Sequence, residues 1–328
     1  MKKIIAILSV LCIVFGLCAC GRDIQPQSNE ITDRPEIQSN TFSESIESIP
    51  DGYFEPIESG AIATETISYT HEDHTKNAIV YLPPNYSESN KYDVLYILPG
   101  SSGDYTTYFS ENGTNRDFQL LLDNMTVNGK IKPCIVAALS FYPKERNMDN
   151  ITLDEMLNDF RSEMTECIMP LIETKYSTYT EGTSKEDLIK SREHRAFAGC
   201  SMGGAIVWDM LATSIEYFKY YAPTAAGSFE DYYPEYQGIG DRIRNELKEK
   251  GYTTNDFFVF GTDGTNDVTY EKMEMLISRL KSEYSDIFVF TENNMSKGNI
   301  TYKVLENAEH NMDYMHIYLY NALQTFWK

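Results

Sequence analysis

Strand-like and helix-like segments alternate along the chain from about Gly52 to its end, and this alternation limits the folds open to it. Continuous apolar runs such as "YDVLYILPG", "KPCIVAALSFYP" and "HRAFAGC" are typical of buried strands. Later segments, "DFFVFG" with "YEKMEMLISRLKSEY" and "NITYKVLEN" with "MDYMHIYLYNALQTFW", repeat the order of strand and then helix. The pattern over 153–176 predicts a helix with five apolar residues on one stripe: Leu157, Phe160, Met164, Ile168 and Leu171.

This order predicts one α/β domain over residues 52–328, with a mostly parallel central sheet and helices on both faces. In such sheets, binding and catalytic sites form at the carboxyl ends of the strands. Candidate functional residues are therefore sought directly after the predicted strands.

The first twenty residues, "MKKIIAILSVLCIVFGLCAC", differ from the rest of the chain. Lys2 and Lys3 precede an apolar run that is short for a membrane span. The run ends in Leu17-Cys18-Ala19-Cys20, which resembles the lipobox of bacterial lipoprotein signal peptides. We expect residues 1–20 to be a lipoprotein signal peptide, with Cys20 lipidated and the exported protein anchored to the extracellular face of the cell membrane. Plain secretion and an uncleaved anchor are the alternatives.

Residues 21–51 are rich in Ser, Glu, Gln, Asn and Pro, with little apolar periodicity. Such a segment buries too little surface to offset the entropy lost on ordering. The composition predicts a disordered tether between the signal peptide and the folded domain.

The net charge of the 328-residue chain is -21 at pH 7. A surface of this charge repels polyanions, which argues against a nucleic-acid partner. Three of the six cysteines lie in the first twenty residues, which leaves Cys134, Cys167 and Cys200 in the domain. An odd number spread over a large domain predicts free thiols and no disulfide framework.

The stretch "HRAFAGCSMGGAIVW" places Ser201 between a predicted strand and a predicted helix. This is the context of a nucleophile elbow, in which small flanking residues let the strand turn sharply into the helix. Gly199 and Gly203 supply those residues. The helix N-terminus after Ser201 adds partial positive charge where an oxyanion would form. The pattern predicts a nucleophilic serine.

A serine nucleophile needs a base, and the chain has five histidines. His71 and His74 lie in a polar stretch, His194 precedes the strand before Ser201, and His316 lies inside a predicted helix. His310, in the loop "AEHNMD" after a strand, is the candidate base.

A catalytic triad has a third residue, a carboxylate that orients the base. In this chain it should follow a strand between Ser201 and His310. The segment "DFFVFGTDGTND" offers Asp263 and Asp267, and either could orient the imidazole. The order serine, aspartate, histidine is that of α/β-hydrolases.

Segments along nearly the whole domain, among them "NAIVYLPPNYSESNKYDVLYILPGSSGD", "SREHRAFAGCSMGGAIVW", "YFKYYAPTAAG" and "GTNDVTYEKM", resemble the esterase D superfamily. Within it they are similar to the family 1 carbohydrate esterases, which are feruloyl and acetylxylan esterases. The family's acid lies in a Gly-Thr-x-Asp motif, so the resemblance implies Asp267 of "GTND" and not Asp263, beside Ser201 and His310.

The chain departs from this family in the oxyanion loop, where "PGSSG" (99–103) replaces the usual His-Gly-Gly-Gly. The oxyanion donors are backbone N–H groups, so we expect those of Ser101 and Met202 to form the hole. Tyr105 and Phe229 are the predicted substrate-binding residues, Phe229 because the family often has an aromatic residue after "YYAPTAAG".

The resemblance implies a serine esterase that hydrolyses feruloyl or acetyl esters on plant cell-wall polysaccharide such as xylan, without metal or organic cofactor. Two alternatives stay open. One is an esterase or acyltransferase for other acyl conjugates, for example a siderophore. The other is a catalytically idle surface lipoprotein that binds its ligand without turnover.

Overall fold

The structure is a computed structural model of the 328-residue chain, and it describes residues 46–57, 63–111, 116–142, 151–233, 236–292 and 294–328. The predicted signal peptide, with Cys20, and most of the predicted tether lie outside these residues. Among the described helices, none combines the length and apolar character needed to cross a membrane.

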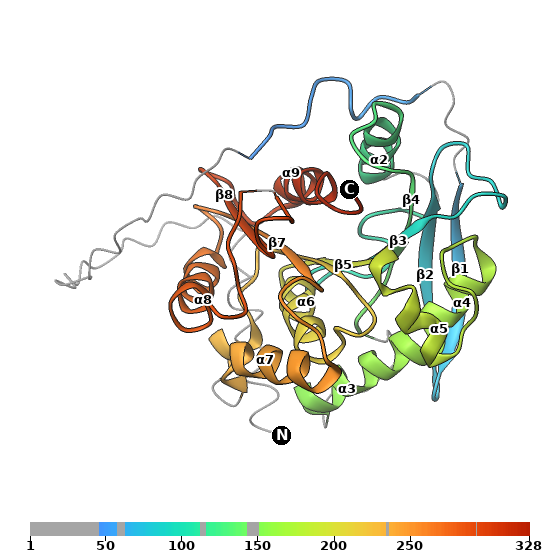
Figure 1. The fold of residues 1–328 in the computed structure, drawn as a ribbon. Coiled ribbons are helices and arrows are strands. Elements are labelled where there is room, and N and C mark those ends of the chain that lie inside the picture. The colour runs from blue at the N-terminus through green and yellow to red at the C-terminus, as the bar shows by residue number, and fades with distance from the viewer. Residues whose placement is uncertain (1–45, 58–62, 112–115, 143–150, 234–235, 293) are drawn as a thin grey trace, which may run out of the picture.

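One eight-stranded sheet runs through the molecule in the order β1-β2-β4-β3-β5-β6-β7-β8 (Figure 1). β1 and β2 form an antiparallel hairpin, β2 pairs antiparallel with β4, and the six strands from β4 to β8 are mutually parallel. The strands are Ala63–His71 (β1), His74–Leu82 (β2), Asp93–Leu98 (β3), Cys134–Ala138 (β4), Arg195–Cys200 (β5), Tyr220–Thr224 (β6), Phe258–Gly264 (β7) and Ile300–Leu305 (β8).

Helices cover both faces of the sheet, as the sequence predicted. Two of them, α2 and α9, pack on one face, while α3, α4, α6, α7 and α8 pack on the other (Figure 1). The helices are Asp117–Val127 (α2), Leu153–Glu163 (α3), Met169–Lys175 (α4), Lys185–Lys190 (α5), Met202–Thr213 (α6), Ile239–Lys250 (α7), Tyr270–Glu283 (α8) and Met312–Leu323 (α9). Short helical turns span Met164–Ile168 (η1), Arg192–His194 (η2) and Phe229–Asp231 (η3).

Successive side chains of each strand point to opposite faces of the sheet, so the sheet divides the hydrophobic core into two layers. In β3, Tyr96 and Leu98 face the layer of α3 and α6, whereas Leu95 and Ile97 face the layer of α2 and α9. Because the central strands are buried on both faces, their sequences read as continuous apolar runs.

The helix predicted over 153–176 is interrupted by the π-helical turn η1. A π turn holds one more residue than an α turn, so it rotates the helix that follows. Ile172 is therefore buried in the core, and Leu171, which the predicted stripe contained, is only half-buried. The rest of the stripe, from Leu157 to Ile168, is buried as expected.

The folded part begins earlier than the predicted boundary at Gly52. The backbone N–H of Glu47 donates to Oδ1 of Asn321 on α9 at 2.9 Å, and Nδ2 of Asn321 donates back to the carbonyl of Glu47 at 2.9 Å. Ile49 packs against the core on the same side. Residues 46–51, predicted as part of the tether, are thus held against α9 by a contact between positions 274 apart, which composition cannot reveal.

The carboxyl ends of the parallel strands share one edge of the sheet, where sites are expected. The turn between β1 and β2 lies at the same edge. β2 runs antiparallel to β4 with Ile79 opposite Ala138 and Tyr81 opposite Val136, so the start of β2 extends past the end of β4.

Candidate active site

Ser201 joins β5 to α6 in a strained backbone conformation, with φ 55° and ψ -123°. A non-glycine residue with positive φ costs on the order of 1–3 kcal/mol and needs a surrounding structure that enforces it. Here the N–H of Ser201 donates to the carbonyl of Thr224 on β6 at 3.0 Å. This is the backbone of a nucleophile elbow, in which the serine is raised above the end of the sheet.

Two glycines make the turn possible because backbone passes directly against them. A β-carbon on Gly199 would lie 2.5 Å from the carbonyl oxygen of Gly203. A β-carbon on Gly203 would lie 2.7 Å from the carbonyl oxygen of Leu98 and 2.6 Å from that of Pro99. Neither position therefore accepts a side chain without displacing backbone of β5, α6 or the end of β3.

The loop after β3, residues 99–103, lies against the elbow. A β-carbon on Gly100 would be 3.2 Å from Cβ and 3.7 Å from Oγ of Ser201. Ser101 follows directly, and Met202 is the first residue of α6, where helical N–H groups have no intrahelical acceptor. The loop that departs from the family pattern is thus next to Ser201. The roles of the Ser101 and Met202 amides as oxyanion donors stay predictions.

His310 and Asp267 are joined directly. Nδ1 of His310 lies 2.8 Å from Oδ1 and 2.9 Å from Oδ2 of Asp267. The Asp267 side chain is buried and that of His310 is 18% exposed. A carboxylate that accepts from Nδ1–H holds the imidazole in the tautomer whose Nε2 can take a proton.

The loops that carry these two residues are bonded to each other beyond the ends of β7 and β8. The N–H of Asn266 donates to the carbonyl of Ala308 at 3.0 Å, and the N–H of Asn307 donates to Oγ1 of Thr265 at 2.7 Å. The pairing of neighbouring parallel strands thus continues into the loops. It brings Asp267 and His310 together although they are 43 positions apart.

Asp263, the other candidate acid, lies beneath Asp267 in the protein interior. It is fully buried, and burial together with the nearby Asp267 charge raises its pKa well above the usual range of a carboxyl group. Thr269 lies between the two aspartates, with Oγ1 2.6 Å from Oδ1 of Asp267 and 3.1 Å from Oδ2 of Asp263. The N–H of Thr269 also donates to Oδ1 of Asp267, at 2.8 Å.

Thr269 is a positioning residue that was not predicted from the sequence. A carboxylate that accepts from the N–H two residues later is an Asx turn, and "DVT" offered that signal. Thr269 holds one oxygen of Asp267, which leaves the carboxylate to face His310 in a fixed orientation.

Tyr105 and Phe229, the predicted substrate-binding residues, are both buried near the catalytic edge. The N–H of Tyr105 donates to Oγ of Ser140 at 2.8 Å, and its hydroxyl donates to Glu111 at 2.8 Å. Phe229, in η3 after β6, packs against the rings of Tyr233 and Tyr236. Both side chains are anchored in these contacts, and substrate contact stays a prediction for each.

The other histidines are apart from the His310–Asp267 pair. His194 bonds through Nδ1 to Asp93 at 2.7 Å, at the amino end of β3, which is the opposite edge of the sheet. His316 is buried in α9, where it stacks on Phe118. His71 and His74 lie at the β1–β2 turn, and His71 forms a group with Glu72 and Asp159 that could hold a metal ion.

The three cysteines of the domain are free thiols, as predicted. Cys134 and Cys200 are buried, and Cys167 is half-buried. Cys200 lies directly beneath the elbow, where burial raises the pKa of its thiol above the usual range.

Comparison with known proteins agrees with this geometry. Residues 71–228 match the family described as putative esterase. A feruloyl esterase module from Clostridium thermocellum, solved with sinapinate, is similar with a TM-score of 0.76 and 29% identity, over 87% of this chain and 94% of the module. A ferulic acid esterase from the anaerobic fungus Anaeromyces mucronatus shares the fold with a TM-score of 0.61 and 20% identity, over 85% of this chain and 96% of that one.

Among curated proteins, the chain is 32% identical over 283 residues to endo-1,4-beta-xylanase Y of Acetivibrio thermocellus. That match covers 85% of this chain but only 24% of the xylanase, so the chain spans about a quarter of that relative's length. The predicted fold class is confirmed: the chain has the α/β-hydrolase fold of these esterases. More narrowly, it resembles the feruloyl esterase modules of family 1 carbohydrate esterases.

The two aspartates should respond differently to the same substitution. Asp267→Asn is expected to lower kcat by about 10⁴, because an amide favours the wrong imidazole tautomer, as the same change does in serine proteases. Asp263→Asn should retain most of kcat at neutral pH, since an uncharged amide resembles the protonated carboxyl that burial favours there. Steady-state kinetics of both variants checks this, with circular dichroism as a control for folding, and the reverse ranking would move the acid to Asp263.

Proposed function

We propose that the protein is a serine esterase that removes feruloyl or acetyl groups from plant cell-wall polysaccharide such as xylan. Ser201 is the nucleophile, His310 the general base and Asp267 the residue that orients it. One observation carries the proposal. The His310–Asp267 pair lies at the same sheet edge as a serine whose backbone is strained into an elbow.

The first half of the reaction forms an acyl-enzyme. His310 takes the proton of Ser201 Oγ as that oxygen attacks the ester carbonyl, and Asp267 stabilises the imidazolium that results. The negative oxygen of the tetrahedral intermediate points to the N–H groups of Met202 and Ser101, where the loss of one donor costs about 3–4 kcal/mol. As the bond between the acyl carbon and the sugar oxygen breaks, His310 gives its proton to that oxygen, and the sugar leaves with a free hydroxyl.

Water completes the turnover. It enters the site of the departed sugar, His310 removes its proton, and the resulting attack releases the carboxylic acid and restores Ser201. Every proton moves between groups that this chain supplies and the two reacting oxygens, so the scheme needs no metal ion or organic cofactor.

The substrate class follows from the relatives. The most extensive structural likeness described above is to a module that was solved with sinapinate, a hydroxycinnamate, and the curated relative is a xylanase. The rings of Tyr233 and Tyr236 are half-buried and pack on the buried Phe229 after the carboxyl end of β6, where a planar aromatic acyl group or a sugar ring could stack on them. This supports an aromatic ester of a polysaccharide as the substrate.

Hydrolysis of methyl ferulate and p-nitrophenyl acetate tests the proposed chemistry. The full chain is expected to hydrolyse at least one of them, and Ser201→Ala and His310→Ala should each remove nearly all turnover, by a factor on the order of 10⁶. The double variant should be scarcely slower than either single variant, because the two residues act as one unit.

His194→Asn is the matched control, since His194 lies at the opposite edge of the sheet and should be dispensable for turnover. Near-normal activity of Ser201→Ala would refute the triad. A folded wild-type protein with no activity on any ester would instead favour a surface protein that binds without turnover.

We also propose that the protein is exported and anchored to the extracellular face of the cell membrane through lipid on Cys20. Cys20 lies outside the described residues, so the proposal rests on the sequence alone. The positive start, the short apolar run and the lipobox-like ending support it. Two or more acyl chains would give stable anchoring, which a single chain does not.

Cys20→Ala should release the protein from the membrane or block its maturation, because the acyl acceptor is lost. Cys12→Ala, within the same apolar run, should leave both unchanged. Membrane fractionation and the size of the mature chain measure the outcome. A Cys20→Ala protein that is cut normally and stays in the membrane fraction would contradict lipidation.

A further inference from the structure

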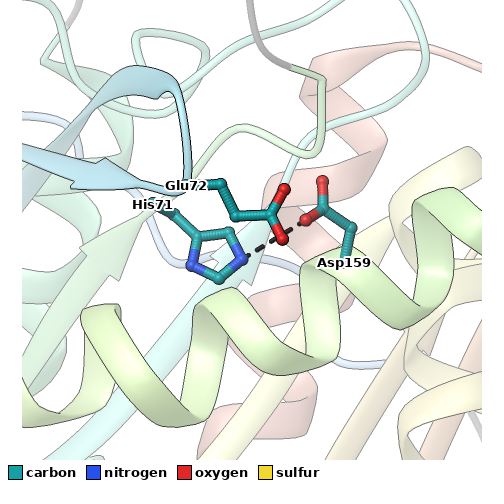
Figure 2. A group of neighbouring side chains, drawn as sticks. All are labelled: His71, Glu72 and Asp159. Atoms are coloured by element: carbon teal, nitrogen blue, oxygen red, sulfur yellow. Dashed lines mark ion pairs between the residues drawn. The ribbon is translucent and has the colours of Figure 1, made fainter.

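Three side chains able to ligate a metal meet where the β1–β2 hairpin turn contacts α3. His71 ends β1, Glu72 is the first residue of the turn, and Asp159 comes from the middle of α3. Figure 2 shows the imidazole and the two carboxylates pointing toward one another. One ligand atom from each residue lies within 4.8 Å of the other two. No step of the proposed ester hydrolysis uses this group.

The distance between His71 and Asp159 suits two ligands of one metal ion better than a direct hydrogen bond. Nε2 of His71 and Oδ1 of Asp159 are 3.3 Å apart, and the pair does not meet hydrogen-bond geometry. A charge-assisted N–H···O bond would be about 2.7–2.9 Å long. Two ligands at 2.0–2.1 Å from a tetrahedral ion are separated by about 3.3 Å, from the bond lengths of zinc sites.

The contacts of Nδ1, the other ring nitrogen of His71, indicate which nitrogen carries the imidazole proton. Sγ of Cys167, on η1, lies 3.4 Å from Nδ1 of His71 and 3.7 Å from the carbonyl of Thr70. With the thiol hydrogen donated to the carbonyl of Thr70, the sulfur is placed to accept from Nδ1–H, and this contact favours the imidazole tautomer whose lone pair is on Nε2.

That nitrogen is buried. His71 is 7% exposed, and within the described part of the chain its Nε2 has no hydrogen-bond partner. A buried polar atom without a partner costs about 1–3 kcal/mol. Nε2 also lies 3.3 Å from Oδ1 of Asp159, and one ligand atom of Glu72 is within 4.8 Å of both groups. A cation bound by these atoms would give Nε2 the partner that it lacks.

We propose that His71, Glu72 and Asp159 bind a zinc ion, with water as the fourth ligand. An imidazole nitrogen with two carboxylate oxygens matches the donors that Zn²⁺ accepts, whereas Ca²⁺ and Mg²⁺ favour oxygen alone. Cys167 acts behind the metal, through Nδ1 of His71, and fixes the ring orientation. Glu72 is exposed, which leaves a side open to water.

The ion would tie two separate parts of the fold together. It would join the β1–β2 turn to the middle of α3, because Asp159 lies far beyond His71 along the chain. The site borders the catalytic edge of the sheet but takes no part in ester chemistry. Its expected effect is on stability.

Binding of Zn²⁺ to the full chain after chelator treatment and dialysis tests the proposal. Calorimetry should show one equivalent of zinc that His71→Asn or Glu72→Gln weakens by about 100-fold or more, since even a residue behind the ligands contributes 10–100-fold. Saturating zinc should raise the Tm of the wild-type protein by several degrees and leave that of Glu72→Gln almost unchanged. Because Glu72 is exposed, Glu72→Gln should fold normally without metal.

The same turn provides matched controls, because Asp73 and His74 are adjacent to the ligands but outside the group. Asp73→Asn and His74→Asn should bind zinc as the wild type does. Cobalt(II) in place of zinc should give ligand-field bands without a thiolate charge-transfer band.

Three results would each overturn the proposal. One is the absence of zinc binding. Another is binding that survives both His71→Asn and Glu72→Gln, which would place the metal elsewhere on the chain. The third is a thiolate band that Cys167→Ala abolishes, which would make sulfur a direct ligand. Any of them leaves the esterase proposal intact, since activity is not the readout.

Discussion

The close approach of α6 to the end of β5 is the constraint on which the active site depends. Helix and strand meet with backbone against backbone at Gly199 and Gly203, and the helix start also touches the end of β3. This contact forces Ser201 to a φ of 55°. The strain is on the order of 1–3 kcal/mol, and burial of α6 against the sheet offsets it. Without the packed sheet, the serine would relax to an ordinary turn.

At the carboxyl ends of β7 and β8, the proposed orientation of His310 depends on which of two neighbouring aspartates is ionised. Asp263 and Asp267 are close enough that ionising both would cost free energy in a buried site, and the deeper residue has the raised pKa. Thr269 separates them and bonds to both. Burial therefore favours the protonated form of Asp263, and Asp267 is the aspartate that contacts His310. This division explains physically why one of two neighbouring acids can orient the base.

The sequence predicted the strands well because parallel strands buried on both faces appear as uninterrupted apolar runs. It also placed Ser201 directly after one such run and His310 in the loop after a later strand, and the structure has both in these positions. The residues alone did not decide whether Asp263 or Asp267 is the acid of the triad. Both lie near the end of β7, and only the direction of their side chains distinguishes them. The resemblance to a known family, and not the residues alone, favoured Asp267, and the contact with His310 agrees.

Other features depended on contacts that no local pattern carries. β6 is short and contains Pro223, and α7 is largely charged, so neither stood out. The π turn at Met164–Ile168 displaced one predicted core position. The pairing of Glu47 with Asn321, and of His71 with Asp159, joins positions far apart in the chain. These contacts arise from the packing of whole elements, which becomes visible only in three dimensions.

Covalent labelling with a fluorophosphonate tests the central claim most directly, because such a reagent reacts with a serine only when a base activates it. Peptide mapping by mass spectrometry should find one adduct, on Ser201, in the wild-type protein and none in His310→Ala. An adduct on any other residue, or equal labelling of Ser201 without His310, would contradict the account.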